Sequence, residues 1–185
     1  MSVDHVPLFF LRQKFAMTTN RYEVVAGDNE ARIIALAEQK RFALKEEVTF
    51  YSDASRSQPV FSFKARAVMD LNSGYDVFDE QRQQIGFFRK DFGASLLRST
   101  FHVEGPGYAG TGQERSQLVA LVRRFTEIPF LPIHFDYVGS DGQPLLSVER
   151  QGTVRDRYTV RVPDPRVDYR VAAAIAVAMD ALMSR

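Results

Sequence analysis

A glycine-rich stretch carries the most specific chemical motif in this sequence. Residues 105–112 read Gly-Pro-Gly-Tyr-Ala-Gly-Thr-Gly and contain the spacing G-x-G-x-x-G. In dinucleotide-binding proteins this spacing joins a strand to a helix, and an acidic residue about 20 positions later binds the ribose. Glu127 and Asp136 straddle that position, and the neighbouring strands read as hairpins. We therefore favour a flexible surface loop, and we keep a nucleotide-binding enzyme that uses this loop as an alternative function.

Other catalytic and metal-binding patterns are missing from the sequence. His5, His102 and His134 are isolated, without the helical pairs or nearby ligands that mark a metal site, and the chain has no cysteine. No Gly-x-Ser-x-Gly elbow and no P-loop occurs. We predict no catalytic residue, no metal site and no cofactor, and we expect the protein not to be an enzyme.

Basic residues at repeated positions suggest a different chemistry. Lys64 and Arg66 are two apart on a predicted strand and so share one face, and Lys14 holds the place of Arg66 in an earlier, similar segment. A second set comes from equivalent ends of two other predicted strands: Lys40, Arg41, Arg89 and Lys90. Either set could bind anionic phospholipid headgroups. The alternative is that these are solvated charges on an outer face.

An amphipathic helix is predicted between Glu114 and Phe125. Its apolar face has helical spacing, and Pro129 and Pro132 prevent its continuation. The apolar residues of this segment and the loop behind it are Leu118, Leu121, Val122, Phe125 and Phe130. They could contact a partner or a membrane, or they could cover an open end of the protein.

Most of the remaining chain predicts strands. Alternating apolar and polar residues begin near Phe9 and return near Phe61, displaced by roughly 52 residues, and a weaker third copy follows Asp136. Each copy contains hairpins with polar turns, such as the Asp-Gly turn at 141–142. We predict an α+β fold that is mainly β, with about twelve antiparallel strands in a closed or nearly closed barrel.

The last segment, 164–185, predicts a buried helix. Asp164 can cap it and Pro165 can open it. All nine residues from Val171 to Met179 are apolar, so the helix requires burial on every side, yet it is shorter than the roughly 20 apolar residues of a membrane span. Its bulky core residues are Val171, Ile175, Met179 and Leu182, and alanines on the other flanks would let strands approach closely.

Length and composition favour one domain, 1–185, without a global charge. The formal net charge is +1, which predicts no nucleic-acid partner, and the absence of cysteine suits a reducing compartment. We expect a cytoplasmic protein without a transmembrane span, with peripheral membrane association as the alternative.

Together these elements resemble a known family. The relevant features are the strands Phe-x-Leu-Arg-Gln-Lys (9–14) and Phe-x-Phe-Lys-Ala-Arg (61–66), the Tyr-x-Val strands with polar turns, and the hydrophobic final helix. The chain resembles the tubby-like superfamily, in its branch of LURP-one-related and phospholipid-scramblase-like proteins. The resemblance covers nearly the whole chain, with 105–131 as an apparent insertion of a glycine-rich loop and a helix. It implies a twelve-stranded barrel around a central helix.

The resemblance also guides the functional expectation. Tubby proteins bind a phosphoinositide through basic residues, but those positions do not match this chain one by one, so no site residue is carried over. Scramblases have an acidic calcium-binding segment before the last helix, where this chain has only Asp164 and Asp168. We expect a non-catalytic binding module that recognises an anionic phospholipid, such as a phosphoinositide, or a protein partner. Lipid transport or scrambling is a further alternative, and it would require the final helix to leave the barrel.

Overall fold

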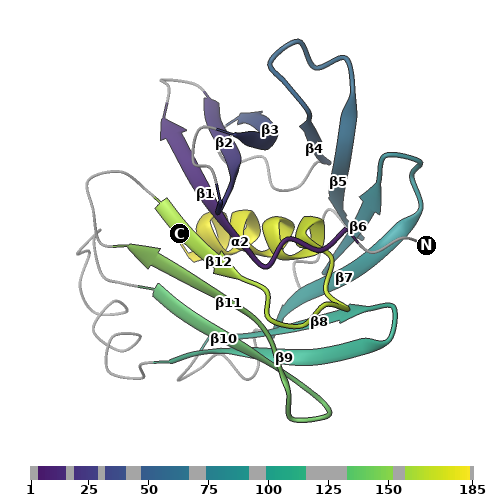
Figure 1. Cartoon of the computed structure of the whole chain (residues 1–185), viewed down its shortest axis with the longest axis vertical. Coiled ribbons are helices and arrows are strands. Elements are labelled where there is room, and N and C mark those ends of the chain that lie inside the picture. The colour runs from purple at the N-terminus through teal and green to yellow at the C-terminus, as the bar shows by residue number, and fades with distance from the viewer. Residues whose placement is uncertain are drawn as a thin grey trace.

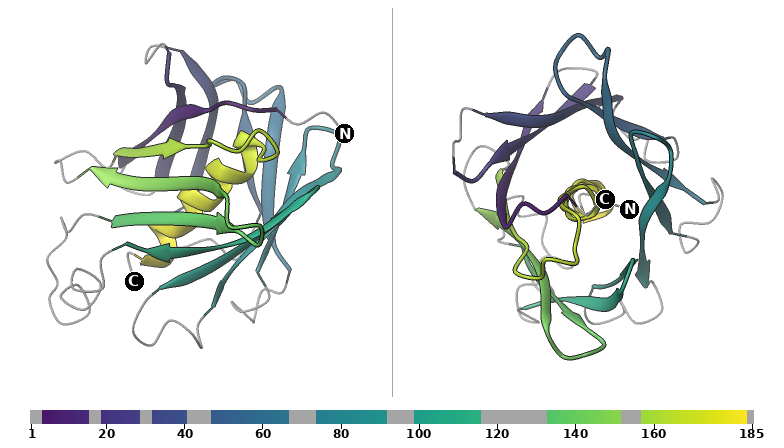
Figure 2. Two further views of the ribbon diagram at one scale, coloured as in Figure 1. Left: turned by 60° about the horizontal axis from the view of Figure 1, so that its bottom comes forward. Right: turned by 45° about the vertical axis from the view of Figure 1, so that its right-hand side comes forward.

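The chain folds into a closed antiparallel barrel around one helix (Figures 1 and 2). The computed structural model describes residues 4–15, 19–28, 32–40, 47–66, 74–91, 99–115, 133–151 and 157–183. The strands are β1 (Leu8–Phe15), β2 (Thr19–Ala26), β3 (Ile33–Lys40), β4 (Val48–Tyr51), β5 (Pro59–Ala65), β6 (Tyr75–Asp79), β7 (Gln84–Asp91), β8 (Thr100–Gly105), β9 (Tyr108–Glu114), β10 (Ile133–Gly139), β11 (Pro144–Gln151) and β12 (Arg157–Arg161). The helix is α2 (Tyr169–Met183).

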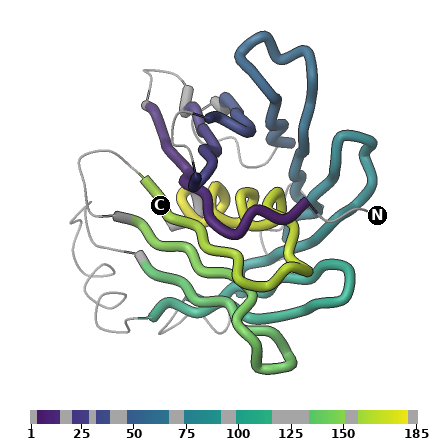
Figure 3. The backbone as a smooth tube through the Cα atoms, viewed as in Figure 1, coloured from purple at the N-terminus to yellow at the C-terminus, as the bar shows by residue number. Residues whose placement is uncertain are grey.

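Each strand pairs with its neighbours in the sequence, and the first strand pairs with the last. Figure 3 shows this as a steady change of colour around the barrel wall. Leu11 of β1 lies opposite both Val24 of β2 and Tyr158 of β12, which closes the sheet. The prediction of about twelve antiparallel strands in a closed barrel is therefore confirmed.

The sequence repeat has a structural counterpart. Phe9 on β1 and Phe61 on β5 both point into the barrel, and both rings meet Tyr169 edge-on, with centroids 6.1 and 6.3 Å apart. Equivalent positions of two repeats thus pack against the first turn of the same helix. This arrangement is expected when similar hairpins surround one central axis.

The central helix is buried on all sides. From Val171 to Met179 every residue is at most 1% exposed, as the continuous apolar run predicts. Small residues bring the wall close to the helix: a Cβ added at Gly86 of β7 would lie only 2.6 Å from a methyl carbon of Val171. Among the described residues, no helix has both the length and the apolar character needed to cross a bilayer.

The helix begins later than the sequence predicts, and its cap is a different aspartate. Asp168 accepts a hydrogen bond from the backbone N–H of Arg170 (2.9 Å), and its carbonyl accepts one from Ala172 (3.2 Å). Asp164 instead forms a separate turn, in which its carboxylate accepts the backbone N–H of Arg166 (2.8 Å). The predicted start at Asp164 and Pro165 was wrong because two capping aspartates lie four residues apart, and the helix begins after the second one, which Arg170 binds.

The glycine-rich stretch is a hairpin and not a loop. Gly105 ends β8, Pro106 and Gly107 form the turn, and the remaining residues belong to β9. Gly107 has a φ of 77°, which glycine adopts without strain. Both the flexible loop and the strand-to-helix geometry required by a dinucleotide site are therefore wrong for this segment.

The predicted helix at 114–125 lies almost entirely outside the described residues. Glu114 is the last residue of β9, and Arg115 follows it. The proposed interaction residues Leu118, Leu121, Val122, Phe125 and Phe130 all fall in the segment 116–132, which is not described. Their role stays a prediction.

Candidate functional site

A groove of about 500 Å³ crosses the outer face of β8, β9 and β10. Its lining comes from all three strands and the turn after β10. The residues are His102, Val103, Glu104, Ala109, Gly110, Thr111, Gln113, Asp136, Val138, Gly139 and Ser140. We refer to this feature as the β9 groove.

Small residues on β9 account for the shape of the groove. Ala109 and Thr111 follow one another on the outward side of the strand, between the larger side chains of β8 and β10. Gly110 faces the other way, where a Cβ would lie 2.5 Å from Leu145 and from the Val138 carbonyl oxygen. The wall is therefore thin and closely packed at β9, directly beneath the groove.

A chain of three polar side chains crosses the groove. His102 Nε2 lies 3.2 Å from a carboxylate oxygen of Asp91, and the hydroxyl of Thr111 lies 3.3 Å from His102 Nδ1. Because a carboxylate only accepts, Asp91 accepts a hydrogen bond from Nε2–H of His102. In a neutral imidazole, Nδ1 then accepts a hydrogen bond from the Thr111 hydroxyl. The three groups stand in the order of a hydrolytic triad. Both contacts are at the long end of the hydrogen-bond range, and we assign them the structural role of holding His102 across three strands.

Two described residues with a formal charge line the groove, and both are acidic. Asp136 receives two hydrogen bonds of 2.7 Å from the guanidinium of Arg115, and these bonds hold the pKa of the Asp136 carboxyl below its usual value. Glu104 is exposed and has no hydrogen bond or ion pair with any residue that the structure describes. The groove therefore presents one neutralised carboxylate and one open carboxylate.

The first basic set lies on the outer wall but is not contiguous. Three strands separate Lys14 on β1 from Lys64 on β5. Lys14 pairs with Glu23 at 2.8 Å, and Arg66 forms a bidentate pair with Asp76 at 2.7 and 2.9 Å. These carboxylates weaken the positive field that an anionic headgroup would encounter.

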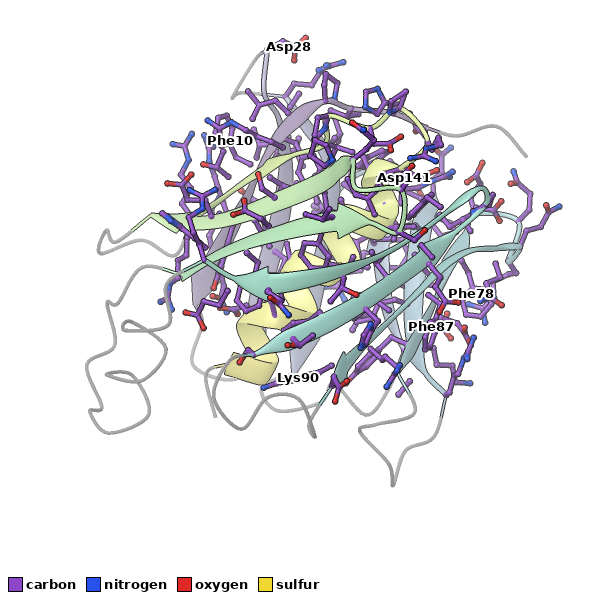
Figure 4. The ribbon with its side chains drawn as sticks, turned by 90° about the horizontal axis from the view of Figure 1, so that it is seen from below. Phe10, Asp28, Phe78, Phe87, Lys90 and Asp141 are labelled. Carbon is purple, nitrogen blue, oxygen red and sulfur yellow. The ribbon has the colours of Figure 1, made fainter. Side chains whose placement is uncertain are left out.

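Arg66 also stacks on an aromatic side chain of the same wall. Its guanidinium carbon lies 3.8 Å from the ring centroid of Phe87, which Figure 4 labels on β7 close to Phe78 of β6. Lys64 and Arg66 are both exposed, so the alternation places them together on the outer face of the wall.

The second basic set is divided between the two faces of the barrel wall. Gly86 and Phe88 face the interior, so Lys90 follows them on the inward side of β7 and Arg89 points outward. Figure 4 shows Lys90 at the barrel end where α2 finishes. Lys40 ends β3, but its side chain is not described, and Arg41 lies outside the described residues.

The three histidines lie in different places. His5 Nε2 is 2.9 Å from the carbonyl oxygen of Val162, and His134 pairs with Glu149 at 3.0 Å on the outer face. Within the described part of the chain, no three histidine or acidic side chains gather as metal ligands would.

The sequence reasoning missed the polar groups that hold both ends of α2. At one end, Arg170 is only 7% exposed and binds Asp168 (2.8 Å) and Glu80 (2.9 Å). At the other end, Asp180 is 5% exposed and accepts hydrogen bonds from the hydroxyls of Tyr22 (3.0 Å) and Tyr158 (2.6 Å). We refer to this second contact as the Asp180 latch. The sequence signal that could have found this contact is strand alternation, which places Tyr22 and Tyr158 on the inward face of the barrel.

The β9 groove was also missed, because residues 105–112 were interpreted as a loop. The run Ala-Gly-Thr-Gly in an alternating strand was the signal that could have found it.

The chain was compared with protein-family models, with curated proteins and with solved structures. The model described as LURP-one-related matches residues 33–180, which cover β3 to α2. Neither the curated proteins nor the solved structures gave a match.

Proposed function

The chain belongs to the LURP-one-related family, within the tubby-like superfamily, and from this premise we propose that it is a non-catalytic binding module that takes a polypeptide partner in the β9 groove. The observation that carries the proposal is the groove itself. It has the size of a ligand site and lies on a part of the wall where small residues permit close approach.

The interior of the barrel supports binding on the outside. The middle of α2 is at most 1% exposed from Val171 to Met179, so the protein's own helix occupies the central space. Barrels that carry a small ligand keep that space open. A partner must therefore be recognised by the outer wall or by the barrel ends.

The closed sheet also determines how a peptide can bind. Each of the twelve strands has two hydrogen-bonded neighbours, although β3 and β4 pair only at Leu36 and Tyr51 among the described residues. At the groove, β9 pairs along its length with β8 and β10, so it has no open edge there. A peptide in the groove therefore cannot bind as a strand added beside β9. Recognition must instead come from side chains such as His102, Glu104 and Thr111.

Blocking the groove tests this proposal. A random peptide library displayed on phage is selected against the wild-type protein, and each recovered peptide is then measured against Ala109→Phe. Ala109 is exposed and lines the groove, so the aromatic ring fills it without disturbing the core. Ala54→Phe, in the exposed turn after β4, is the matched control. We expect peptides that bind the wild type and Ala54→Phe equally and lose affinity for Ala109→Phe. If no recovered peptide distinguishes the two variants, the groove is not the binding site.

The non-catalytic assignment has its own test. A fluorophosphonate probe labels hydroxyl nucleophiles that a histidine activates. We expect no labelling of Thr111 at neutral pH, and labelling that is lost in His102→Ala would contradict the assignment.

Recognition of an anionic phospholipid headgroup is the second candidate function. Lys64 supports it, because this side chain is exposed on β5. The carboxylates beside Lys14 and Arg66 argue for weak binding. Co-sedimentation with vesicles that contain a phosphoinositide tests it, and binding that is lost in the double variant Lys64→Glu, Arg66→Glu would establish a lipid site on β5. Under either function we propose a cytoplasmic location, with peripheral membrane association if the lipid is bound.

A further inference from the structure

We propose that the β9 groove binds a basic side chain, arginine or lysine, of its polypeptide partner. This inference rests on the proposed function, since it names the chemistry of the groove's occupant. Its starting point is charge. Glu104 and Asp136 are acidic, and among the lining residues that the structure describes there is no lysine or arginine.

Glu104 is the open contact point for a cation. Its position on β8 lies opposite Phe87 of β7 and Ala109 of β9, which has almost no side chain to cover it. No residue within the described ranges forms an ion pair or hydrogen bond with its carboxylate. Arg66 is near enough for its charge to interact with Glu104, but its guanidinium is held by Asp76. An incoming cation therefore displaces no existing hydrogen bond.

Asp136 shows the geometry that the groove already supports. Arg115 holds this carboxylate through Nε and a terminal nitrogen, both at 2.7 Å, although the Arg115 side chain is 60% exposed. The same two-pronged contact is available to a guanidinium at Glu104. On the β10 side of the groove, Asp136 is therefore already paired with Arg115 of the same chain. On the β8 side, Glu104 is open to a guanidinium from a partner.

The neutral polar groups add acceptors. When His102 is neutral and donates from Nε2 to Asp91, the Thr111 hydroxyl donates to Nδ1, and the lone pairs of its oxygen remain available. A guanidinium has five donor hydrogens and an ammonium three, and neither accepts a hydrogen bond. The acceptors of Thr111 and Glu104 therefore match a basic group.

An apolar contact lies beside these acceptors. Val138 is opposite Thr111 in the sheet and is 45% exposed, one of the two large apolar side chains with high exposure in the described residues. The aliphatic stem of a lysine or arginine, or a neighbouring aliphatic residue, can cover it. The occupant we infer is a basic residue next to an aliphatic one.

The peptides selected by phage display provide the test. We expect those that depend on an open groove to be enriched in arginine or lysine beside an aliphatic residue. Glu104→Gln should weaken their binding about tenfold, because the pair loses its charge while the side chain keeps its size. Glu38→Gln, on the exposed outer face of β3, is the matched control and should leave affinity within about twofold. Raising the salt concentration should weaken binding to the wild type more than binding to Glu104→Gln.

The outcomes separate the two proposals. Peptides that require the groove but carry no basic residue, or that bind Glu104→Gln as tightly as the wild type, would overturn this inference and leave the proposed function in place. Recovery of peptides that all bind Ala109→Phe normally would overturn both. Basic peptides that respond equally to Glu104→Gln and Glu38→Gln would indicate general charge attraction and would also overturn the inference.

Discussion

Replacing Tyr158 with phenylalanine removes one hydroxyl from the Asp180 latch without changing the packing of the ring. The Asp180 carboxylate is 5% exposed, and the Tyr158 hydroxyl donates to it at 2.6 Å, a length typical of a strong O–H···O⁻ bond. A hydrogen bond to a charged group contributes about 1.5–3 kcal/mol. We therefore expect Tyr158→Phe to lower the free energy of unfolding by about 1.5–3 kcal/mol.

Urea unfolding at pH 7 measures this effect, with the midpoint lowered and the m-value unchanged. Tyr137→Phe is the matched control, because this buried hydroxyl donates to the thioether of Met179 at 3.3 Å, a weak acceptor on the same helix. Loss of the Tyr137 hydroxyl should lower the free energy of unfolding by less than about 1 kcal/mol. In an Asp180→Asn background, the cost of Tyr158→Phe should also fall, since a neutral acceptor replaces the carboxylate. Equal costs for Tyr158→Phe and Tyr137→Phe in the wild-type background, or an unchanged cost of Tyr158→Phe in the Asp180→Asn background, would refute a charged latch.

Three further changes test the core, the turn before the helix and the thin part of the wall. Ile175→Asp buries a carboxylate at a position with 0% exposure, and we expect insoluble protein, measured as the soluble fraction on expression; a soluble, folded variant would contradict the central-helix packing. Hydrogen bonds from Arg166 hold the pKa of Asp164 below its usual value. The ionised carboxylate therefore stabilises the fold fully when the pH is above the unfolded-state pKa of Asp164. This contribution is lost as the pH falls through the lower folded-state pKa. The unfolding free energy of the wild type should therefore fall more steeply between about pH 5 and 2 than that of Arg166→Gln, and parallel curves in urea titrations would show that the pair is not coupled to folding. Gly112→Ala should lower the free energy of unfolding by about 1–3 kcal/mol, because the new methyl group would overlap the ring of Tyr137. An unchanged melting temperature would show that the ring can move aside without cost.

The barrel and its central helix could be predicted because their signals are local. Strand alternation places Phe9 and Phe61 on the inward face, independently of the rest of the chain. The nine residues from Val171 to Met179 are all apolar, so this helix has no polar face that could contact water. The repeat of similar hairpins then favours a closed sheet, since each unit must bury its apolar face against something shared.

The start of α2 and the nature of residues 105–112 could not be decided in this way. Asp164 and Asp168 have equal local capping ability, and the choice depends on Arg170, which reaches both Asp168 and Glu80 on a distant strand turn. The glycines of β9 carry no strand propensity, so their strand conformation comes from pairing with β8 and β10.

The candidate site depends on tertiary structure to a greater degree. The basic residues were visible in the sequence, but only the sheet register shows that Asp76 and Glu23 lie beside Arg66 and Lys14. The β9 groove joins residues from three strands, and no spacing in the sequence brings His102, Thr111 and Val138 into one row. The sequence by itself determined which residues face inward and that a helix fills the barrel, because these follow from periodicity and apolar character. Tertiary structure alone decided which charges are neutralised and where the wall is hollow, because both depend on partners that are distant in the chain.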